Sequence, residues 1–156
     1  MTPSEREVSD DAAPQGGSGV SHRARRSWSL VHAPRTSRGR LFIADRNNNR
    51  IQIFDQNGTF LDEWTQFGRP SGIAITKDDT IYVADSESWG PDEPGWKKGI
   101  RVGSAKDGSV KYFIEDIEST TVDHSGAEGV GVDREGNVYG SVVRRMMLEK
   151  HVLQKP

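Results

Sequence analysis

The sequence predicts an all-β fold made of repeated four-stranded units, and three observations predict it. Short runs rich in β-branched and aromatic residues alternate with turns that contain Gly, Asn and Asp, as strands do. No window shows a convincing 3.6-residue period of apolar side chains, so no helix is expected. The strand-like runs also recur along the chain about 40 residues apart, which is typical of a repeat architecture.

Composition sets the outer limits of this prediction. The chain has 156 residues, enough for one domain, and only 33% of them are hydrophobic. With no cysteine, a disulfide framework, a thiolate nucleophile and a zinc–thiolate site are all excluded. The formal net charge of -2 gives no overall case for a nucleic-acid partner. No apolar run is long enough for a membrane span, and the first 20 residues lack the apolar core of a signal peptide.

The charge divides the chain into two regions. Residues 1–40 carry seven Arg and four acids, whereas residues 41–156 carry 14 basic and 19 acidic residues. We expect residues 1–36 to be a disordered, polar and basic N-terminal segment and residues 37–156 to form the folded blades. Six Arg within Ser21–Arg40 favour a solvated tail, with a nucleic-acid or anionic-surface patch as the alternative.

The strands are expected in a regular order. Arg40–Asp45 and Arg50–Phe54 are β-rich, and Thr59–Trp64 follows as a third strand. Between the last two, Asn57-Gly58 is a hairpin signal, which predicts a type I′ turn. Near the C-terminus, the run from Arg144 to Leu153 is interpreted as a strand.

Internal similarity supports the repeat. Leu41–Asp45 matches Ile81–Asp85 at an offset of 40, and Gly72–Thr76 matches Gly129–Asp133 at an offset of 57. Arg50–Gly58 aligns more loosely with Ile100–Gly108, which places Ile51 on Arg101. The difference between these offsets predicts about ten extra residues within Ser86–Trp96.

Units of about 40 residues with four short strands are typical of β-propeller blades. One blade cannot cover its own apolar faces, so blades pack radially and each buries a face against the next. Gly72–Ile75 is the expected innermost strand, where small residues fit near the axis. We therefore predict a partial β-propeller of about three four-stranded blades, whose first blade lacks its inner strand because His32–Ser37 does not alternate.

The segments Leu41–Phe54 and Pro70–Asp85 resemble NHL repeats, and a third unit from Gly126 matches more loosely. Such propellers typically have six blades, so about three blades imply a fragment, a ring completed by self-association of two copies, or an open arc; we favour the fragment. In more detail, Trp96–Gly108 and Gly126–Val130 resemble bacterial propellers related to the lyase half of peptidylglycine α-amidating enzymes. Relatives of this type are often exported, but no export signal is visible, so the sequence does not assign a cellular compartment.

The resemblance implies two kinds of function. The first is a scaffold that binds a peptide, glycan or protein through its face loops. The second is a metal-dependent lyase acting on peptidyl-hydroxyglycine, with a zinc ion held by His residues. Ser71 and Glu128 stand where the resemblance expects His at the inner strands, and His124 and His151 show no ligand spacing. Zinc and calcium are the two candidate metals of the family, and no metal ligand is assigned.

Two residues are predicted for catalysis. In the amidating lyases, the Arg directly after the Asp that ends a second strand lies at the mouth of the active site. Arg46, which follows Asp45, matches that position. A guanidinium there can hold a substrate carboxylate or a developing oxyanion; the alternative is a solvated loop Arg. Glu128 is expected at the channel mouth as an acid, a base or a calcium ligand, or else as a hydrogen-bonded loop carboxylate.

Three further residues are predicted for ligand binding. Asp85 ends a second strand, where the alternative is a purely structural carboxylate that accepts backbone N–H groups. Trp89 and Trp96 share one long loop with three acidic residues. Aromatic rings beside carboxylates suit cationic, sugar or peptide ligands. The alternative is that both indoles pack the loop onto its blade.

Overall fold

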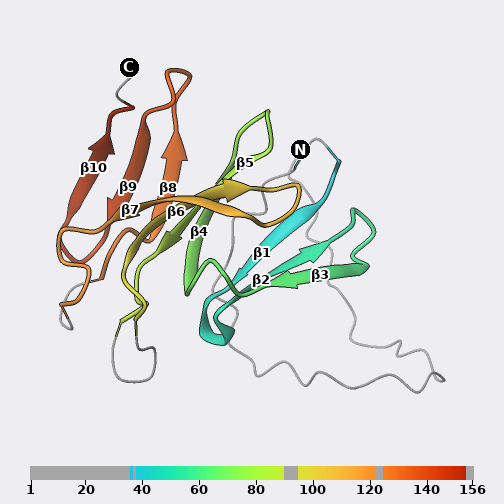
Figure 1. Ribbon diagram of the computed structural model, residues 1–156, viewed down its shortest axis with the longest axis horizontal. Helices are drawn as coiled ribbons and strands as arrows, with labels where there is room; N and C mark the ends of the chain where they lie inside the picture. The colour runs from blue at the N-terminus through green and yellow to red at the C-terminus, as the bar shows by residue number, and fades with distance from the viewer. Residues whose placement is uncertain (1–35, 37, 90–94, 122–124, 154–156) are drawn as a thin grey trace, which may run out of the picture.

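The computed structural model describes residues 36, 38–89, 95–121 and 125–153 (Figure 1). Within them the chain forms β-strands and one short 3₁₀ turn, arranged in three antiparallel sheets. The elements are β1 (Leu41–Asp45), η1 (Arg46–Asn48), β2 (Arg50–Phe54), β3 (Phe60–Trp64), β4 (Pro70–Ile75), β5 (Thr80–Asp85), β6 (Gly99–Ser104), β7 (Val110–Glu115), β8 (Gly129–Val132), β9 (Val138–Val142) and β10 (Met147–His151).

Each sheet is one blade. Blade 1 has the order β1-β2-β3, blade 2 the order β4-β5-β6-β7, and blade 3 the order β8-β9-β10. Figure 1 shows the three sheets side by side, with blade 2 between the other two. The prediction of an all-β partial propeller of about three blades is confirmed, and blade 1 indeed has no strand beside the inner edge of β1 among the described residues.

The strands β1, β5 and β9 occupy equivalent positions, as the second strand of a complete blade. The same hairpin turn precedes each of them, over residues 36–40, 76–80 and 133–137. In each, the first residue donates its N–H to the carbonyl of the fifth, and the fourth donates to the carbonyl of the first. The fourth residues all have positive φ: +71° at Gly39, +65° at Asp79 and +87° at Gly136. Thr36, which the sequence assigned to the disordered segment, is therefore part of blade 1 and is buried. The rest of that segment lies outside the described residues.

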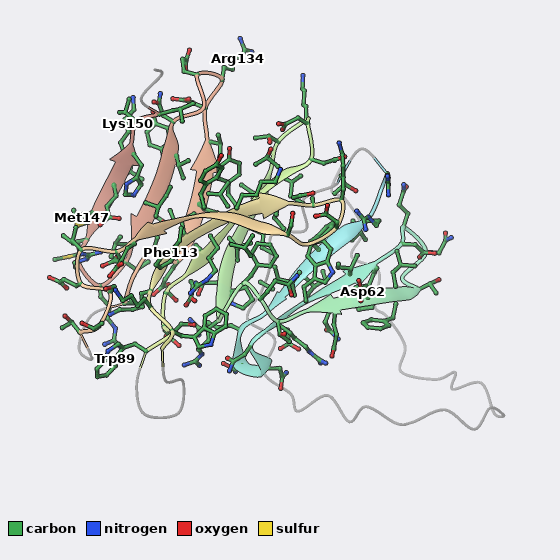
Figure 2. The ribbon with its side chains drawn as sticks, viewed as in Figure 1. Asp62, Trp89, Phe113, Arg134, Met147 and Lys150 are labelled. Atoms are coloured by element: carbon green, nitrogen blue, oxygen red, sulfur yellow. The ribbon has the colours of Figure 1, made fainter. Side chains whose placement is uncertain are left out.

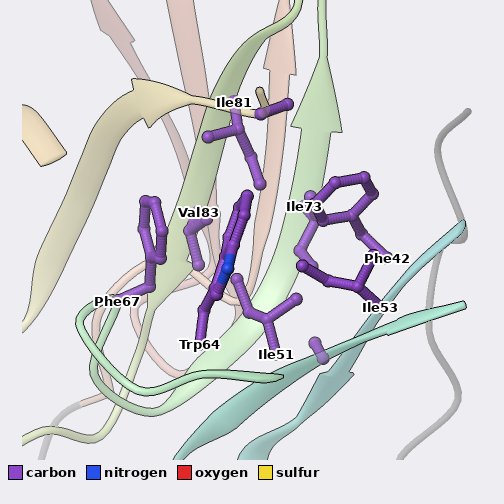
Figure 3. Packing of buried hydrophobic residues seen from close by; sticks show 10 residues of the cluster. Phe42, Ile51, Ile53, Trp64, Phe67, Ile73, Ile81 and Val83 are labelled. Carbon is purple, nitrogen blue, oxygen red and sulfur yellow. The ribbon is translucent and has the colours of Figure 1, made fainter. Parts of the chain in front are cut away.

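The two hydrophobic cores lie between blades rather than within them. The first contains Phe42 and Ile51 of blade 1 together with Ile73 and Ile81 of blade 2 (Figure 3). The Trp64 ring packs against the rings of Phe42 and Phe67, with centroid distances of 5.4 and 6.0 Å. The second joins the opposite face of blade 2 to blade 3 and contains Ala84, Ile100, Val102, Ala127, Val138 and Val142. Alternate residues of β5 thus point into different cores, because successive side chains of a strand lie on opposite faces.

Two local predictions are wrong. Asn57 does not have a positive φ, so the turn before β3 is not type I′. The Asp55 carboxylate instead accepts the N–H groups of Asn57 and Thr59, both at 2.8 Å, and Gly58 alone takes the left-handed conformation.

The second wrong prediction concerns the register of β6. Ile51 pairs with Ala44, and Ile100 pairs with Ala84, so Ile100 takes the place of Ile51, one residue earlier than predicted. The extra residue lies in the β6–β7 turn, where Ser104 rather than Ala105 bonds to Ser109. A one-residue slip exchanges the two faces of a strand. Arg101 therefore points toward blade 1, and Ile100 points into the core with blade 3.

Candidate functional site

Five connections meet on one face of the propeller, which we call the loop face. They are the segments after β1, β5 and β9 and those that lead from β3 to β4 and from β7 to β8. Because equivalent strands run in the same direction, these segments gather at one end of the blades and the hairpin turns at the other, as Figure 1 shows. Propellers and other scaffolds carry function on such loops. Arg46, Asp85, Trp89, Trp96 and Glu128 all lie on or next to them.

Asp85 organises the loop face from beneath. Its side chain has no exposed surface, and its Oδ1 accepts the N–H groups of Ser88 at 2.8 Å and Glu87 at 3.3 Å. The Ser88 hydroxyl in turn accepts the N–H of Arg69 at 3.0 Å. Asp85 therefore fixes two loops from different connections, which matches the structural alternative for this residue. Ligand binding by Asp85 stays a prediction.

A buried ion pair completes this arrangement. Arg101 Nη1 donates to Asp85 Oδ2 at 2.5 Å, and Arg101 Nη2 donates to the Lys97 carbonyl at 3.0 Å. Burial raises the pKa of the Asp85 carboxyl, and the Arg101 guanidinium opposes that rise. The Arg101 guanidinium is itself held between two rings, 4.6 Å from the centre of Trp96 and 4.7 Å from that of Phe113.

Arg46 lies in a second ionic cluster, in which two arginines face the carboxylate of Glu87. We call Arg46 and Arg69 the arginine pair. Arg46 Nη1 and Arg69 Nη2 approach the two carboxylate oxygens of Glu87, each at 3.4 Å. The side chains are 25%, 27% and 37% exposed, so solvent reaches all three. The three loops that carry them start from blade 1, from the β3–β4 connection and from blade 2, so the cluster spans the boundary between two blades.

A pocket of about 270 Å³ lies beside the arginine pair. Trp96, a residue that is 37% exposed, contributes its indole, although the ring also packs on Arg101. The pocket is lined by Asn48, Asn49, Thr65, Gly68, Ser88 and Trp96. Amide and hydroxyl groups surrounding one aromatic ring can fix the orientation of a polar ligand while the ring buries its apolar part.

The other predicted site residues lie apart from this pocket. Trp89 is half-buried and lies at the loop end of blade 2 (Figure 2). Glu128 precedes β8, where its carboxylate accepts the Ser125 hydroxyl at 3.4 Å, next to a wider pocket of about 470 Å³ between β4 and β8. Among the described residues no hydrogen bond or ion pair joins Arg46 to Glu128, so the structure does not bring the two predicted catalytic residues together.

The residues at the inner strands do not fit a zinc ion held by histidines. At the start of β4 the hydroxyl of Ser71 bonds to that of Ser86 at 2.5 Å, and Glu128 stands at the same place before β8. Neither position offers an imidazole. Calcium needs six or more oxygen ligands, whereas Glu128 is a single carboxylate, and no group of three His, Asp or Glu gathers anywhere in the described part.

Arg69 is the functional candidate that sequence reasoning missed. It directly precedes the inner strand that begins at Pro70, in the connection from β3. The predicted propeller already places every such connection on the loop face. The predicted order of strands could therefore have placed Arg69 on the loop face. Its ion pair with Glu87 could not be predicted in this way, because it depends on the conformation of two loops.

The blades, their interblade cores and their shared loop face define a β-propeller. A family model for the NHL repeat matches residues 35–54 and 67–88. The chain therefore carries NHL repeats, in blade 1 and in the first half of blade 2. The finer resemblance to amidating lyases stays a prediction.

A solved structure shows the same fold. Hydrazine synthase of Kuenenia stuttgartiensis is similar over 78% of this chain, with a TM-score of 0.51 and 18% sequence identity. The match spans 36% of that protein's chain. At this identity the similarity supports the fold alone. A search of the curated proteins found no match.

In the part of the chain that the structure describes, no helix has the length and apolar character needed to cross a membrane.

Proposed function

We propose that this NHL propeller is a scaffold that binds a peptide or a segment of another protein on its loop face. The observation that carries the proposal is the pocket of about 270 Å³ beside Trp96, because loops of two blades converge on it. The buried Asp85–Arg101 pair holds two of these loops in place. A preorganised surface loses little entropy when a ligand binds.

The ring of Trp96 and the amides of Asn48 and Asn49 favour a peptide as the ligand. Amide groups match the donors and acceptors of a peptide backbone, and the indole offers apolar area for one side chain. The overall charge of residues 41–156 is negative, which disfavours a polyanion such as nucleic acid.

Selection from a random peptide display library on the full chain tests this proposal. We expect the selected peptides to share a short motif and to lose binding in Thr65→Trp, because this exposed residue lines the pocket and an indole there would fill it. The matched control is Tyr112→Ala, an aromatic that is 69% exposed on the outer strand of blade 2. Selected peptides whose binding is unchanged by Thr65→Trp, or no selected peptide at all, would contradict the proposal.

A further inference from the structure

The wider pocket between β4 and β8, of about 470 Å³, has one charged side chain in its wall, that of Glu128. The other described residues that line it are glycines, serines, apolar residues and Tyr139, and they include no Lys, Arg or His. A cavity whose lining carries a single negative charge attracts a ligand with a positive one. The composition of the wall therefore points to a cation.

The charge of Glu128 has little compensation from the protein. In the described part of the chain, its carboxylate forms no ion pair and accepts one side-chain hydrogen bond, from the Ser125 hydroxyl at 3.4 Å. That distance is well beyond the usual value of about 2.5–2.7 Å for a hydroxyl on a carboxylate. The residue is half-buried, and its oxygens keep most of their capacity to accept hydrogen bonds from a ligand.

The backbone of Glu128 is fixed between blades 2 and 3. Its N–H donates to the Ser141 carbonyl at 2.9 Å. On the other side it lies against Gly72 of β4, where an added Cβ atom would come within 2.7 Å of the Glu128 carbonyl oxygen. The carboxylate thus starts from a rigid position, which lowers the entropy that is lost when a ligand binds.

The rest of the pocket suits an organic cation better than a metal ion. Leu148 pairs with Ser141 across blade 3, lines the pocket and is 67% exposed, so it offers apolar surface next to a hydroxyl. An added Cβ atom at Gly131 would meet nothing within 4 Å, which leaves room for a ligand along β8. A metal ion would need several ligands, and Glu128 is a single carboxylate.

From these observations we infer that the pocket binds an alkylammonium group, with the charged nitrogen at Glu128 and the alkyl chain along Leu148. The three N–H donors of an ammonium group match the carboxylate and the nearby Ser141 hydroxyl. The group belongs to a free amine or to a lysine side chain of a peptide. The inference does not depend on peptide binding beside Trp96, because the two pockets share no lining residue.

Lys150 gives the ligand a direction. It pairs with Tyr139 across blade 3, and its Nζ lies 5.4 Å from the centre of the Tyr139 ring. Figure 2 shows Lys150 at the end of blade 3 that lies away from the loop face. Its positive charge repels an ammonium group from that end, whereas Glu128 attracts it at the other.

NMR titration of the dilute full chain with n-pentylammonium tests the inference, and 1-pentanol is the neutral control. Dilution keeps self-association through the Leu148 face from competing. We expect saturable shifts of the Glu128, Gly129 and Gly131 amides with the ammonium, and at least about tenfold weaker binding of the alcohol. Equal binding of the two probes, or no saturable shift with the ammonium, would overturn the inference.

A second probe distinguishes the two sources of the ammonium group. Acetyl-lysine methylamide carries the same group on a peptide unit. If it binds as tightly as n-pentylammonium, the pocket takes the lysine side chain of a peptide. If it binds much more weakly than n-pentylammonium, the pocket takes a free amine. Both results support an alkylammonium site.

Two variants test the site from different sides. Glu128→Gln keeps the shape of the side chain and removes its charge, and we expect about tenfold weaker binding of n-pentylammonium. Gly131→Val fills the open space with a residue that strands favour, and we expect a similar loss. Amide signals of blade 1 that do not move show that each variant is folded.

Two controls separate the site from general electrostatics and from the pocket beside Trp96. Glu135→Gln removes an exposed carboxylate of the same blade, in the hairpin turn of residues 133–137. Thr65→Trp fills the other pocket. Neither should change the affinity for n-pentylammonium. Unchanged affinity in Glu128→Gln, or an equal loss in Glu135→Gln, would contradict the assignment of the cation to Glu128.

Discussion

Gly68 lies directly over the buried carboxylate of Asp85. Its φ is +73°, and a Cβ atom there would clash with Asp85 Oδ2 and crowd the Ser88 hydroxyl. Only glycine satisfies both the backbone conformation and the close approach. The residue thus connects the backbone of the β3–β4 loop to the polar centre that holds the loop face.

Gly68→Ala tests this packing. We expect a loss of unfolding free energy of about 3 kcal/mol or more, from the left-handed backbone and from overpacking together. The control is Gly58→Ala, whose φ is +83° and whose added Cβ meets nothing within 4 Å, so that it should cost only about 1 kcal/mol. Urea denaturation measures both, and equal losses would contradict the packing argument.

Asp133 provides a prediction about pH. Hydrogen bonds from the Asn137 side chain and backbone and from Tyr139 lower the pKa of its carboxyl from 3.8 to about 2. A lowered folded pKa means that this stabilisation is complete above pH 4 and is lost as the pH falls through about 2. We expect NMR titration to give a carboxyl pKa near 2 that moves toward 3.8 in Asn137→Ala. An unchanged pKa in this variant would contradict the assignment of the cause.

At the residue scale, sequence reasoning succeeded where the repeat fixes a position. Arg46 follows the Asp that ends a second strand, and Trp96 lies in the long loop, so both were placed on the loop face. The partners of Arg46 were not predictable, because they depend on how loops from two blades meet. For Asp85 the structural alternative matches the geometry, since a carboxylate at a buried strand end needs donors.

At the scale of elements, the free edge of β1 has a measurable consequence. β5 lies between β4 and β6, whereas β1 pairs only with β2 among the described residues. Alternate amides of β1 therefore lack a strand partner on the inner edge.

Hydrogen exchange measures this difference. We expect alternate amides of β1 to exchange at least about tenfold faster than the equivalent amides of β5, because an unpaired edge opens at little cost in free energy. The β9 amides, with partners on both sides, serve as a second protected reference. Equal protection along β1 and β5 would mean that another strand covers the edge.

The strands themselves were predictable because their patterns are local. β1, β2 and β3 lie where the sequence placed them, and β10 occupies the predicted C-terminal run. The register of β6 was not predictable, because one additional residue in the β6–β7 turn shifts the alignment of this strand with β2 by one position. Loop length is free to vary at the surface, so repeats cannot fix the register across it.

At the scale of the whole molecule, blade 3 leaves one face open. Leu148 pairs with Ser141 as Ile100 pairs with Ala84 and Ile51 with Ala44. Ile51 and Ile100 are buried by the next blade, whereas Leu148 is 67% exposed. Blade 3 therefore has the face with which blades 1 and 2 pack against the following blade, and the described residues leave that face exposed.

Self-association through this face remains a prediction that sedimentation velocity tests. We expect the average mass to rise with concentration and Leu148→Glu to reduce the rise, because a buried charge opposes packing. The control is Leu61→Glu, on an outer strand and 48% exposed, which should not matter. A monomer mass at every concentration would contradict the prediction.

The central claim is that neighbouring NHL blades pack face to face and so bring their loops onto one surface. The most direct test is an NMR measurement of nuclear Overhauser contacts between methyl groups and aromatic rings in the full chain. The account predicts contacts from the Phe42 and Trp64 rings of blade 1 to the Ile73, Ile81 and Val83 methyl groups of blade 2. Absence of these contacts in a folded sample would contradict the radial packing, and with it the shared site of Arg46, Arg69 and Glu87.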